Sequence, residues 1–363
     1  MTVEKKQITY LSAPLMIWYD VTTVCDFNCK HCYSASGKRS PDELNTVEAK
    51  HLIDQVAAKG TFYIYFLGGE PFMRPDFIEL VEHAKKVGLA VMINTNGWYL
   101  DDEVASRLAA CGTDEIRFSL DGASPEIHDD FRGKLGSHAR VLAGIDRTTS
   151  QGISTSATFT MTQKNYTEIK AAAELLIDHG VTAIQFGQLS AVGRGRDNAD
   201  LTLNADQTKW VREEIGNLRE RYLPKINIYS VDGTYDKPCT RCVHDGKAFP
   251  DFMGCQAGRT CCNVTPNGNV VPCLLNRAPI AGNVRETTFG EIWDNSELFS
   301  KFRSVRENFE CQNCKYNTVC ARECPLSASQ TGVAGENRIK VVENVWGSVD
   351  EGKSLCHISY CTT

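Results

Sequence analysis

Short hydrophobic runs alternate with longer amphipathic segments from residue 16 to about residue 190. The runs are rich in β-branched and aromatic residues, which favour strands, and the segments between them repeat apolar residues at helical spacing. Candidate strands cover residues 16–21, 62–67, 90–94, 115–120, 154–160 and 183–187, and candidate helices include 46–58, 75–87, 101–110 and 166–177. Six such repeats predict an α/β fold, a partial (β/α)6 barrel similar to an incomplete (β/α)8 barrel, with functional residues at the C-terminal strand ends.

The pattern changes after residue 200. Residues 201–222 predict one further helix with Trp210, Ile215 and Leu218 along one face. From 225 onward the chain consists of short pieces rich in Gly, Pro and Cys, which bury little core without metal clusters to hold them together. Because 363 residues exceed the usual size of a single core, we expect more than one domain. The predicted division is an N-terminal extension (1–13), a barrel (14–224), a linker (225–253) and a cysteine-rich domain (254–363).

Charge and composition narrow the class of partner. The net charge is −6 and no basic tract is present, so nucleic acid and anionic membranes are not expected partners. No signal peptide or long apolar segment is evident, which indicates a cytoplasmic protein. In a reducing compartment cysteines ligate metals more often than they form disulfides. Fifteen of the sixteen cysteines fall within residues 25–32 and 239–361, which favours metal clusters.

The first cysteine motif is Cys25-x3-Cys29-x2-Cys32, directly after the first candidate strand. A [4Fe-4S] cube takes four thiolate ligands, so three cysteines leave one iron open to a small molecule. Zinc is the alternative. Zinc motifs, however, add a second pair of Cys or His, and the next fifty residues offer only His51.

Two further motifs carry a resemblance to a known family. Gly68-Gly69-Glu70-Pro71 follows the second candidate strand and Asn94-Thr95-Asn96-Gly97 follows the third. With the cysteine motif, they make residues 14–200 similar to the radical S-adenosylmethionine (SAM) superfamily. The resemblance implies that the open iron binds SAM, which is cleaved reductively to a 5'-deoxyadenosyl radical that abstracts hydrogen from a substrate. It also implies that the Glu70 carboxylate holds the methionine ammonium. Gly68 and Gly69 lack a Cβ and let backbone approach a ligand closely.

Other residues at predicted strand ends are candidates for the same site. By resemblance, Asn94, Asn96, Ser119 and Asp121 lie beside the nucleoside or the substrate, although Asn and Asp-Gly also form ordinary turns. Gln185 follows at the sixth strand. Arg194 could bind a carboxylate of the cofactor or of a substrate in bidentate fashion, or could be a solvated loop arginine.

The later cysteines resemble the SPASM extension of radical enzymes that modify peptides. Their spacing is Cys255-x5-Cys261, Gly268-x4-Cys273 and C-x2-C-x5-C-x3-C from Cys311, followed by Cys356. The resemblance implies two auxiliary [4Fe-4S] cubes, with two structural zinc sites as the alternative. One cube would be held by Cys255, Cys261, Cys273 and Cys324, and the other by Cys311, Cys314, Cys320 and Cys356.

Four cysteines depart from the SPASM pattern. Cys262 is a rival to Cys261, and Cys361 is a rival to Cys356. Cys239 and Cys242 form an additional C-x2-C motif. These four could hold a third auxiliary cluster, or could be free thiols or a redox pair.

Three functions compete. The leading one is a maturase that installs a crosslink or an oxidative modification in a ribosomally made peptide, since residues 34–46 resemble maturases of the mycofactocin type, in the same class as those of pyrroloquinoline quinone. The second is a tetrapyrrole-modifying enzyme of heme biosynthesis, and the third is a non-catalytic electron-transfer protein, against which the Glu70 motif argues.

About two dozen residues precede Cys25, so we expect a separate recognition protein, or the enzyme surface itself, to bind the peptide leader. Flavodoxin or ferredoxin would supply electrons.

Overall fold

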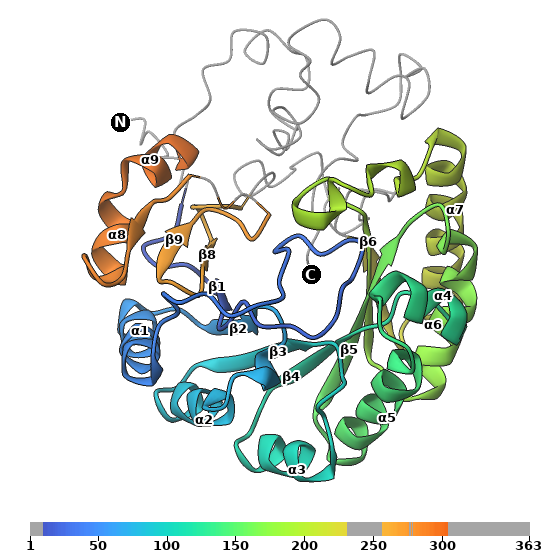
Figure 1. Ribbon diagram of the computed structural model, residues 1–363, viewed down its shortest axis with the longest axis horizontal. Coiled ribbons are helices and arrows are strands. Elements are labelled where there is room, and N and C mark those ends of the chain that lie inside the picture. Colours follow the sequence, from blue (N-terminus) through green and yellow to red (C-terminus); the bar gives the residue numbers. More distant parts are fainter. Residues whose placement is uncertain (1–9, 231–255, 276, 278, 304–363) are drawn as a thin grey trace, which may run out of the picture.

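A curved sheet surrounded by helices forms most of the molecule (Figure 1). The computed structural model describes residues 10–230, 256–275, 277 and 279–303. Seven parallel strands follow one another around the sheet in chain order. They are β1 (Met16–Asp20), β2 (Tyr63–Leu67), β3 (Ala90–Thr95), β4 (Glu115–Ser119), β5 (Ser154–Met161), β6 (Ala183–Gln188) and β7 (Asn227–Ser230).

Helices cover the convex side of this sheet (Figure 1). They are α1 (Thr46–Lys59), α2 (Phe77–Lys86), α3 (Asp102–Ala110), α4 (Pro125–Arg132), α5 (Ser137–Ser150), α6 (Ile169–Asp178) and α7 (Ala205–Tyr222), with short 3-10 turns η1 (Pro71–Met73), η2 (Tyr166–Glu168), η3 (Gly193–Gly195) and η4 (Ala199–Leu201). Local signals set the helix ends: Asn45 and Glu48 form a capping box at the start of α1, and Gly60 ends it in a left-handed conformation.

The two faces of the strands differ in polarity. Ile17, Phe66 and Phe118 are fully buried in one hydrophobic core with α1 residues such as Leu52. Side chains alternate along a strand, so in each of these strands the residues next to the buried one face the concave side. That side is polar in β4, where Arg117 donates to Glu115 (2.9 Å) and to Gln185 of β6 (2.7 Å). The helix-facing side therefore stabilises the fold, and the concave side can contact ligands.

The cysteine-rich region shares the sheet of the barrel. β8 (Cys261–Val264) pairs in parallel with β1, and β9 (Asn269–Val271) and β10 (Gly282–Asn283) follow as antiparallel strands. Helices α8 (Phe289–Asn295) and α9 (Glu297–Arg303) pack beside them. β7 lies within the predicted linker and extends the sheet beyond residue 224. The predicted domain boundaries themselves stay predictions.

Most predicted elements are confirmed to within one or two residues. The helix predicted over 201–222 begins later, at Ala205. The sequence reading missed α4 and α5, which both lie between β4 and β5. In α7 the buried positions include Val211, Ile215 and Leu218, whereas Trp210 is 39% exposed and packs against Tyr166 of η2. Trp210 therefore lies at the exposed edge of the face that contains Ile215 and Leu218.

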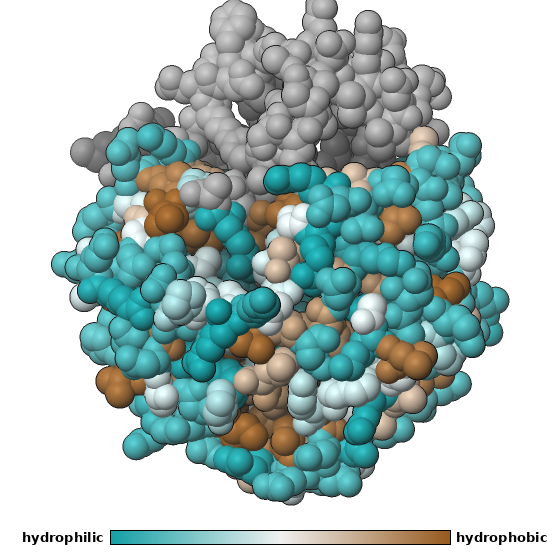
Figure 2. Space-filling model, viewed as in Figure 1, coloured by the Kyte–Doolittle hydropathy of each residue, from teal (hydrophilic) through white to brown (hydrophobic). Residues whose placement is uncertain are grey.

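Hydrophilic side chains predominate on the face shown in Figure 2, and hydrophobic ones form small separate groups there. Within the described part of the chain, none of the helices has the length and apolar character needed to cross a membrane.

Candidate functional site

The three cysteines of the first motif lie in the loop that follows β1, here called the Cys loop (residues 21–37). This loop leaves the sheet at the edge where β2, β3 and β4 also end, because these strands are parallel. Cys25 N–H donates to Gly37 O (3.0 Å), and Gly37 N–H donates to Thr23 O (2.9 Å). Cys29 is buried, and Cys25 and Cys32 are partly buried. Three thiols thus lie at the predicted end of the strands.

The surroundings of these thiols suit a metal cluster. Burial raises the pKa of Cys25 to about 12, and the charges of Glu70, Cys29 and Cys32 add to the rise. Such thiols become thiolates when a metal replaces the proton. In the described residues, no three His, Cys, Asp or Glu side chains converge on one metal ion. A [4Fe-4S] cube offers each thiolate a different iron, so the donor set fits a cube better than a single zinc ion.

Gly68 and Gly69 bring the Cys loop against the end of β2. Gly69 N–H donates to Thr22 O (2.8 Å) and Glu70 N–H to Val24 O (2.7 Å). A Cβ on Gly69 would lie 2.0 Å from Val24 O, and one on Gly68 would lie 2.5 Å from Thr22 O. Gly68 also has φ +141°, which other residues rarely adopt. The backbone that approaches these glycines is therefore that of the Cys loop.

Glu70 is fully buried beneath this loop. Its Oε1 accepts hydrogen bonds from Phe72 N–H (3.2 Å) and the Thr95 hydroxyl (2.9 Å), and its Oε2 accepts one from Asn96 N–H (2.8 Å). Burial raises the pKa of Glu70 to about 7 although these bonds oppose the rise. A carboxylate accepts about four hydrogen bonds, so Oε2 can take one more donor. Its position and spare acceptor capacity fit the ammonium group that the sequence predicts.

The asparagines after β3 differ in their surroundings. Asn96 is buried, and its Oδ1 accepts from Trp98 N–H (2.9 Å). Its Nδ2 has no hydrogen-bond partner among the described residues, an uncommon state for a buried amide. Asn94 is partly buried within β3, opposite Arg117 of β4 in the sheet register. Among the described residues, Nδ2 of Asn96 is thus a donor without an acceptor, and the N–H of the same residue donates to Glu70. A ligand could supply the missing acceptor.

Asp121 occupies the other side of the Cys loop, and Ser119 ends β4 nearby. The Asp121 carboxylate is fully buried, accepts from Thr160 N–H (2.6 Å) and lies 2.6 Å from Arg132 Nε. Burial alone would raise the pKa of Asp121, but the Arg132 guanidinium holds it below its usual value. Asp121 therefore already has a cation, whereas Ser119 is partly buried and faces the strand β5 residue Thr158 in the register.

Arg132 and His31 are residues of the site that the sequence reading missed. Arg132 Nη1 donates to Cys29 Sγ at 3.7 Å. The His31 ring stacks on Phe131 with centroids 4.7 Å apart, and burial lowers the pKa of His31 to about 4, so it is neutral at pH 7. The available signal was the spacing in α4, where His128, Phe131 and Arg132 at i, i+3 and i+4 share the buried face.

Gln185 and Arg194 contact other parts of the protein. Gln185 Oε1 accepts from Arg117 on the concave face of the sheet. Arg194 donates from Nε to Cys29 O (2.9 Å) and from Nη1 to Ser36 O (2.7 Å). Its own N–H donates to Cys32 O (3.0 Å). Arg194 therefore contacts backbone carbonyls on both sides of Cys32 and holds the Cys loop in place.

Two of the three described cysteines of the C-terminal region lie in β8, next to β1 in the sheet, and the third, Cys273, follows β9. Cys261 and Cys262 are neighbours in β8, so their side chains point to opposite faces. Cys262 is paired with Ile17 and lies in the hydrophobic core, where burial raises its pKa. Cys261 faces the other side, and Cys273 is partly buried. The remaining predicted ligands and rivals lie outside the described residues: Cys255, Cys311, Cys314, Cys320, Cys324, Cys356, Cys239, Cys242 and Cys361.

A partly buried ion pair joins this region to the Cys loop. Asp20, the last residue of β1, accepts from Arg277 Nη2 (2.6 Å) and Asn263 Nδ2 (3.0 Å). The Arg277 guanidinium also lies 5.2 Å from the centre of the Tyr33 ring, next to Cys32. The segment that carries Cys273 is therefore tied to the segment that carries Cys32.

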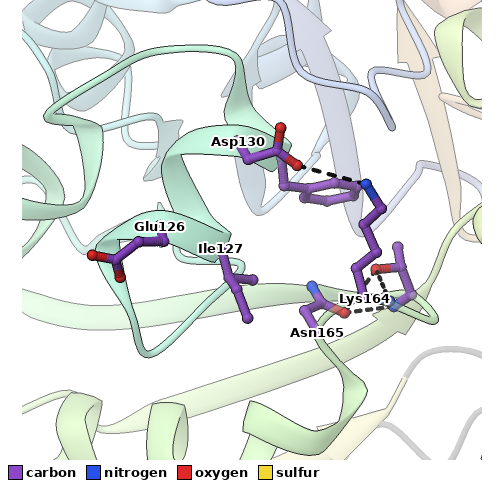
Figure 3. A pocket seen from close by; sticks show the side chains of 7 residues that line it. Glu126, Ile127, Asp130, Lys164 and Asn165 are labelled. Carbon is purple, nitrogen blue, oxygen red and sulfur yellow. Dashed lines mark hydrogen bonds and ion pairs between the residues drawn. The ribbon is translucent and has the colours of Figure 1, made fainter.

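A small pocket lies at the rim next to Asp121 (Figure 3). Its volume is about 240 Å³, and Glu126, Ile127, Asp130, Phe131, Thr162, Lys164 and Asn165 line it. Asp130 and Lys164 face each other across it, 3.9 Å apart. Pockets for whole small-molecule ligands hold roughly 300–1,000 Å³, so this one is suited to a single side chain.

Comparisons with known proteins agree with this geometry. The sequence model of the radical SAM superfamily matches residues 19–176, and that of the SPASM iron-sulfur cluster-binding domain matches residues 255–322. The chain is 35% identical to an AdoMet-dependent heme synthase of Methanosarcina barkeri, over 86% of the chain and 92% of the relative. It is 32% identical to the mycofactocin maturase MftC of Mycobacterium tuberculosis, over 89% of the chain and 81% of the relative.

Solved structures share the fold at low sequence identity. Streptococcus suis SuiB bound to the precursor peptide SuiA aligns with a TM-score of 0.74 and 18% identity, over 88% of this chain and 74% of SuiB. Native anSMEcpe with bound AdoMet aligns with a TM-score of 0.66 and 17% identity, over 86% of this chain and 89% of that one.

Proposed function

Because the chain belongs to the radical SAM superfamily and is an enzyme with [4Fe-4S] clusters and SAM as cofactors, we propose that Cys25, Cys29 and Cys32 hold the cluster that binds SAM. When bound, this cluster supplies the electron that cleaves SAM to a 5'-deoxyadenosyl radical. The observation that carries the assignment is that the loop with these three cysteines packs against Glu70, whose N–H donates to Val24 O (2.7 Å) and whose Oε2 can accept one more donor.

The residues around the Cys loop have separate roles in this proposal. Glu70 accepts a hydrogen bond from the ammonium group of the nucleotide, and Nδ2 of Asn96 donates to an acceptor atom elsewhere on the nucleotide. Gly68 and Gly69 hold the Cys loop close to Glu70. Asn94 and Ser119 line the concave side where the nucleoside and substrate meet, as the family resemblance implies. Asp121, Gln185 and Arg194 act on other protein groups and position them.

The C-terminal cysteines hold two auxiliary [4Fe-4S] cubes, with the ligand sets that the sequence implies. At the one ambiguous position that the structure describes, we assign Cys261 as the ligand. The support is the burial of Cys262 in the hydrophobic core beside Ile17, on the opposite face of β8.

The substrate that we propose is a ribosomally made peptide, in which the enzyme installs a crosslink or an oxidative modification. The support is the extended similarity to the mycofactocin maturase and the charge of the rim. Four cations around the Cys loop already have carboxylate partners at 2.6–2.9 Å: Lys30 with Asp130, Lys134 with Asp26, Arg132 with Asp121 and Arg277 with Asp20. A substrate with several carboxylates would need cations that are not already paired.

The second candidate substrate is an iron porphyrin. The observation that favours it is the 35% identity to a heme synthase over 92% of that relative. The two candidates require opposite outcomes in one assay, so they can be separated directly.

The assay uses the anaerobically reconstituted enzyme with dithionite and SAM. One set of reactions contains each short peptide encoded beside the enzyme's gene, and the other contains iron-coproporphyrin III. A mass change in a peptide, with 5'-deoxyadenosine released in proportion, supports peptide maturation. Loss of carboxylates from the porphyrin with all peptides unchanged would replace it by the second candidate.

The proposal also includes the partners of the reaction. A separate small protein delivers the peptide, flavodoxin or ferredoxin supplies the electrons, and the reaction takes place in the cytoplasm. Tight binding of the peptide by the purified enzyme alone would remove the need for a delivery protein.

A further inference from the structure

Arg132 is a buried cation placed between a carboxylate and a cysteine of the Cys loop. Arg132 is the last residue of α4, and only 7% of its surface is exposed. Its Nε lies 2.6 Å from Asp121 Oδ2, and its Nη1 donates to Cys29 Sγ at 3.7 Å. The guanidinium thus bridges one fixed anion and one sulfur that becomes an anion when it binds iron.

The charge of Arg132 is permanent under these conditions. An arginine side chain is protonated throughout the physiological pH range, and the Asp121 carboxylate beside Arg132 favours its charged form. Removing a guanidinium from water costs several kcal/mol unless its partners are well placed. The planar guanidinium contacts both partners at once, through a close ion pair with Asp121 and a hydrogen bond to Cys29, which an ammonium does less well.

The surrounding backbone fixes the position of Arg132 relative to Cys29. Lys30 N–H donates to Phe131 O (3.0 Å), which docks the Cys loop on the end of α4. Gly133 has φ +66°, and a Cβ there would lie 2.9 Å from Asn28 O. The residues on both sides of Arg132 therefore contact the residues on both sides of Cys29, so the contact belongs to a built interface.

We propose that Arg132 is a positioning residue that raises the reduction potential of the cluster on the Cys loop by donating a charge-assisted hydrogen bond to the Cys29 thiolate, with Asp121 orienting its guanidinium. Hydrogen bonds to ligand sulfurs and nearby charge are established determinants of cluster potential. A cation stabilises the reduced cluster, which carries one more electron, more than the oxidised one. The inference rests on the assignment of Cys25, Cys29 and Cys32 as ligands under Proposed function.

The test compares Arg132→Gln with Arg140→Gln in the reconstituted full-length enzyme without SAM. Arg140 is exposed on α5, and its guanidinium lies over the Trp98 ring. Among the described residues it donates to no cysteine sulfur, so its replacement removes the same charge without removing a hydrogen bond to a thiol. The midpoint potential is measured by redox titration with detection by electron paramagnetic resonance. Signals of the auxiliary clusters are subtracted with a variant in which Cys25, Cys29 and Cys32 are all replaced by Ala.

For Arg132→Gln we expect about a tenfold lower ratio of reduced to oxidised cluster at a fixed potential, which is a shift of about 59 mV to more negative values. Arg140→Gln should remain at the wild-type potential. The difference should be constant from pH 7 to pH 9, since a guanidinium does not titrate there. An unchanged potential in Arg132→Gln at full iron content, or an equal shift in Arg140→Gln, would overturn the proposal.

A second measurement decides the matter if Arg132→Gln does not fold. Wild-type enzyme labelled with guanidino-¹⁵N arginine should show a nitrogen coupling to the reduced cluster in pulsed electron paramagnetic resonance, and Arg132→Lys should lose it. The same coupling in Arg132→Lys would contradict the inference. If the triple Ala variant keeps the iron and the signal of the full enzyme, the ligand assignment itself is wrong, and that result is distinct from the others.

Discussion

Each side of the Cys loop has one fully buried carboxylate. The two carboxylates have different hydrogen-bond and ion-pair partners, and their pKa values shift in opposite directions. On the β2–β3 side, Glu70 accepts from two N–H groups and a hydroxyl, and burial raises its pKa to about 7. On the β4–α4 side, Asp121 has Arg132 at 2.6 Å, and its pKa is lowered. Equal burial with opposite shifts shows that the partner decides the protonation state.

This difference assigns a function to each side. Of the described residues, no Lys, Arg or His lies within 4 Å of the Glu70 carboxylate as an ion-pair partner, so its negative charge is best stabilised by a cation that arrives with a ligand. Asp121 is already neutralised, and its carboxylate orients Arg132. The β2–β3 side is therefore the one suited to bind the nucleotide ammonium, and the β4–α4 side is suited to adjust the cluster.

The largest expected effect is on stability, from Asp121→Asn. The change leaves Arg132 buried without its counter-ion, and breaking a buried ion pair costs about 3–5 kcal/mol. Urea unfolding of the cluster-free protein measures it. Asp130→Asn is the matched control, because its pair with Lys30 is exposed and worth about 0–1 kcal/mol. Equal losses in the two variants would show that the buried pair has no special role.

Glu70→Gln should show the reverse pattern. It removes the charge that holds the ammonium, so the affinity for SAM should fall by about 10- to 100-fold, equivalent to about 1.4–2.7 kcal/mol. Stability should change less than in Asp121→Asn, because no buried cation loses its partner. Equilibrium titration of the reconstituted enzyme with SAM gives the affinity. Wild-type affinity in this variant would remove Glu70 from the nucleotide site.

The sequence located the β2–β3 side well because its signals are local. The strand ends at residues 67 and 95 were predicted to within one residue, since hydrophobic runs end there at Gly and Asn. Glu70 follows its strand directly, so the fold places it at the strand edge. What the sequence could not give is the reason for the glycines, because the Cys loop that packs on them is more than forty residues away.

The β4–α4 side was predicted less completely because its contacts are distant in sequence. Arg132 reaches Cys29 across 103 residues, and Arg194 reaches the same residue across 165. No spacing rule connects residues so far apart, and α4 itself was missed. Trp210 shows a similar limit for predicting burial. Helical periodicity places Trp210 near the apolar face of α7, but it does not tell that the side chain lies at the exposed edge of this face.

Thr95→Val tests whether neutral donors contribute to the β2–β3 side. The hydroxyl donates to Glu70 Oε1 and accepts from Gly97 N–H (3.0 Å), so its loss leaves a buried N–H unpaired. We expect a loss of about 2 kcal/mol in unfolding free energy and a weaker affinity for SAM than in the wild type. Thr158→Val is the control, because that hydroxyl makes a longer contact with Phe118 O (3.4 Å). A smaller loss for Thr95→Val than for Thr158→Val would refute this view of the site.

Glu43→Gln is expected to have the smallest effect. It is a specific test because the Glu43 carboxylate has neutral donors, as Glu70 does, and a cation, as Asp121 does. Its carboxylate accepts from Thr23 N–H (2.7 Å), the Thr22 hydroxyl (3.1 Å) and Arg39 Nε (3.1 Å). Burial alone would raise the pKa of Glu43, but the bonds from Thr23 and Thr22 lead the groups that hold it below its usual 4.5.

The sign of the pH dependence follows from this lowered pKa. The folded state favours ionised Glu43, so its contribution to stability is fully present above pH 4.5 and is lost as the pH falls through the lower folded value. Wild type should exceed Glu43→Gln by about 1 kcal/mol at pH 7, and the gap should close in acid. Urea unfolding of both cluster-free proteins at several pH values checks it. A gap that widens below pH 4.5 would mean that burial dominates at Glu43 as it does at Glu70.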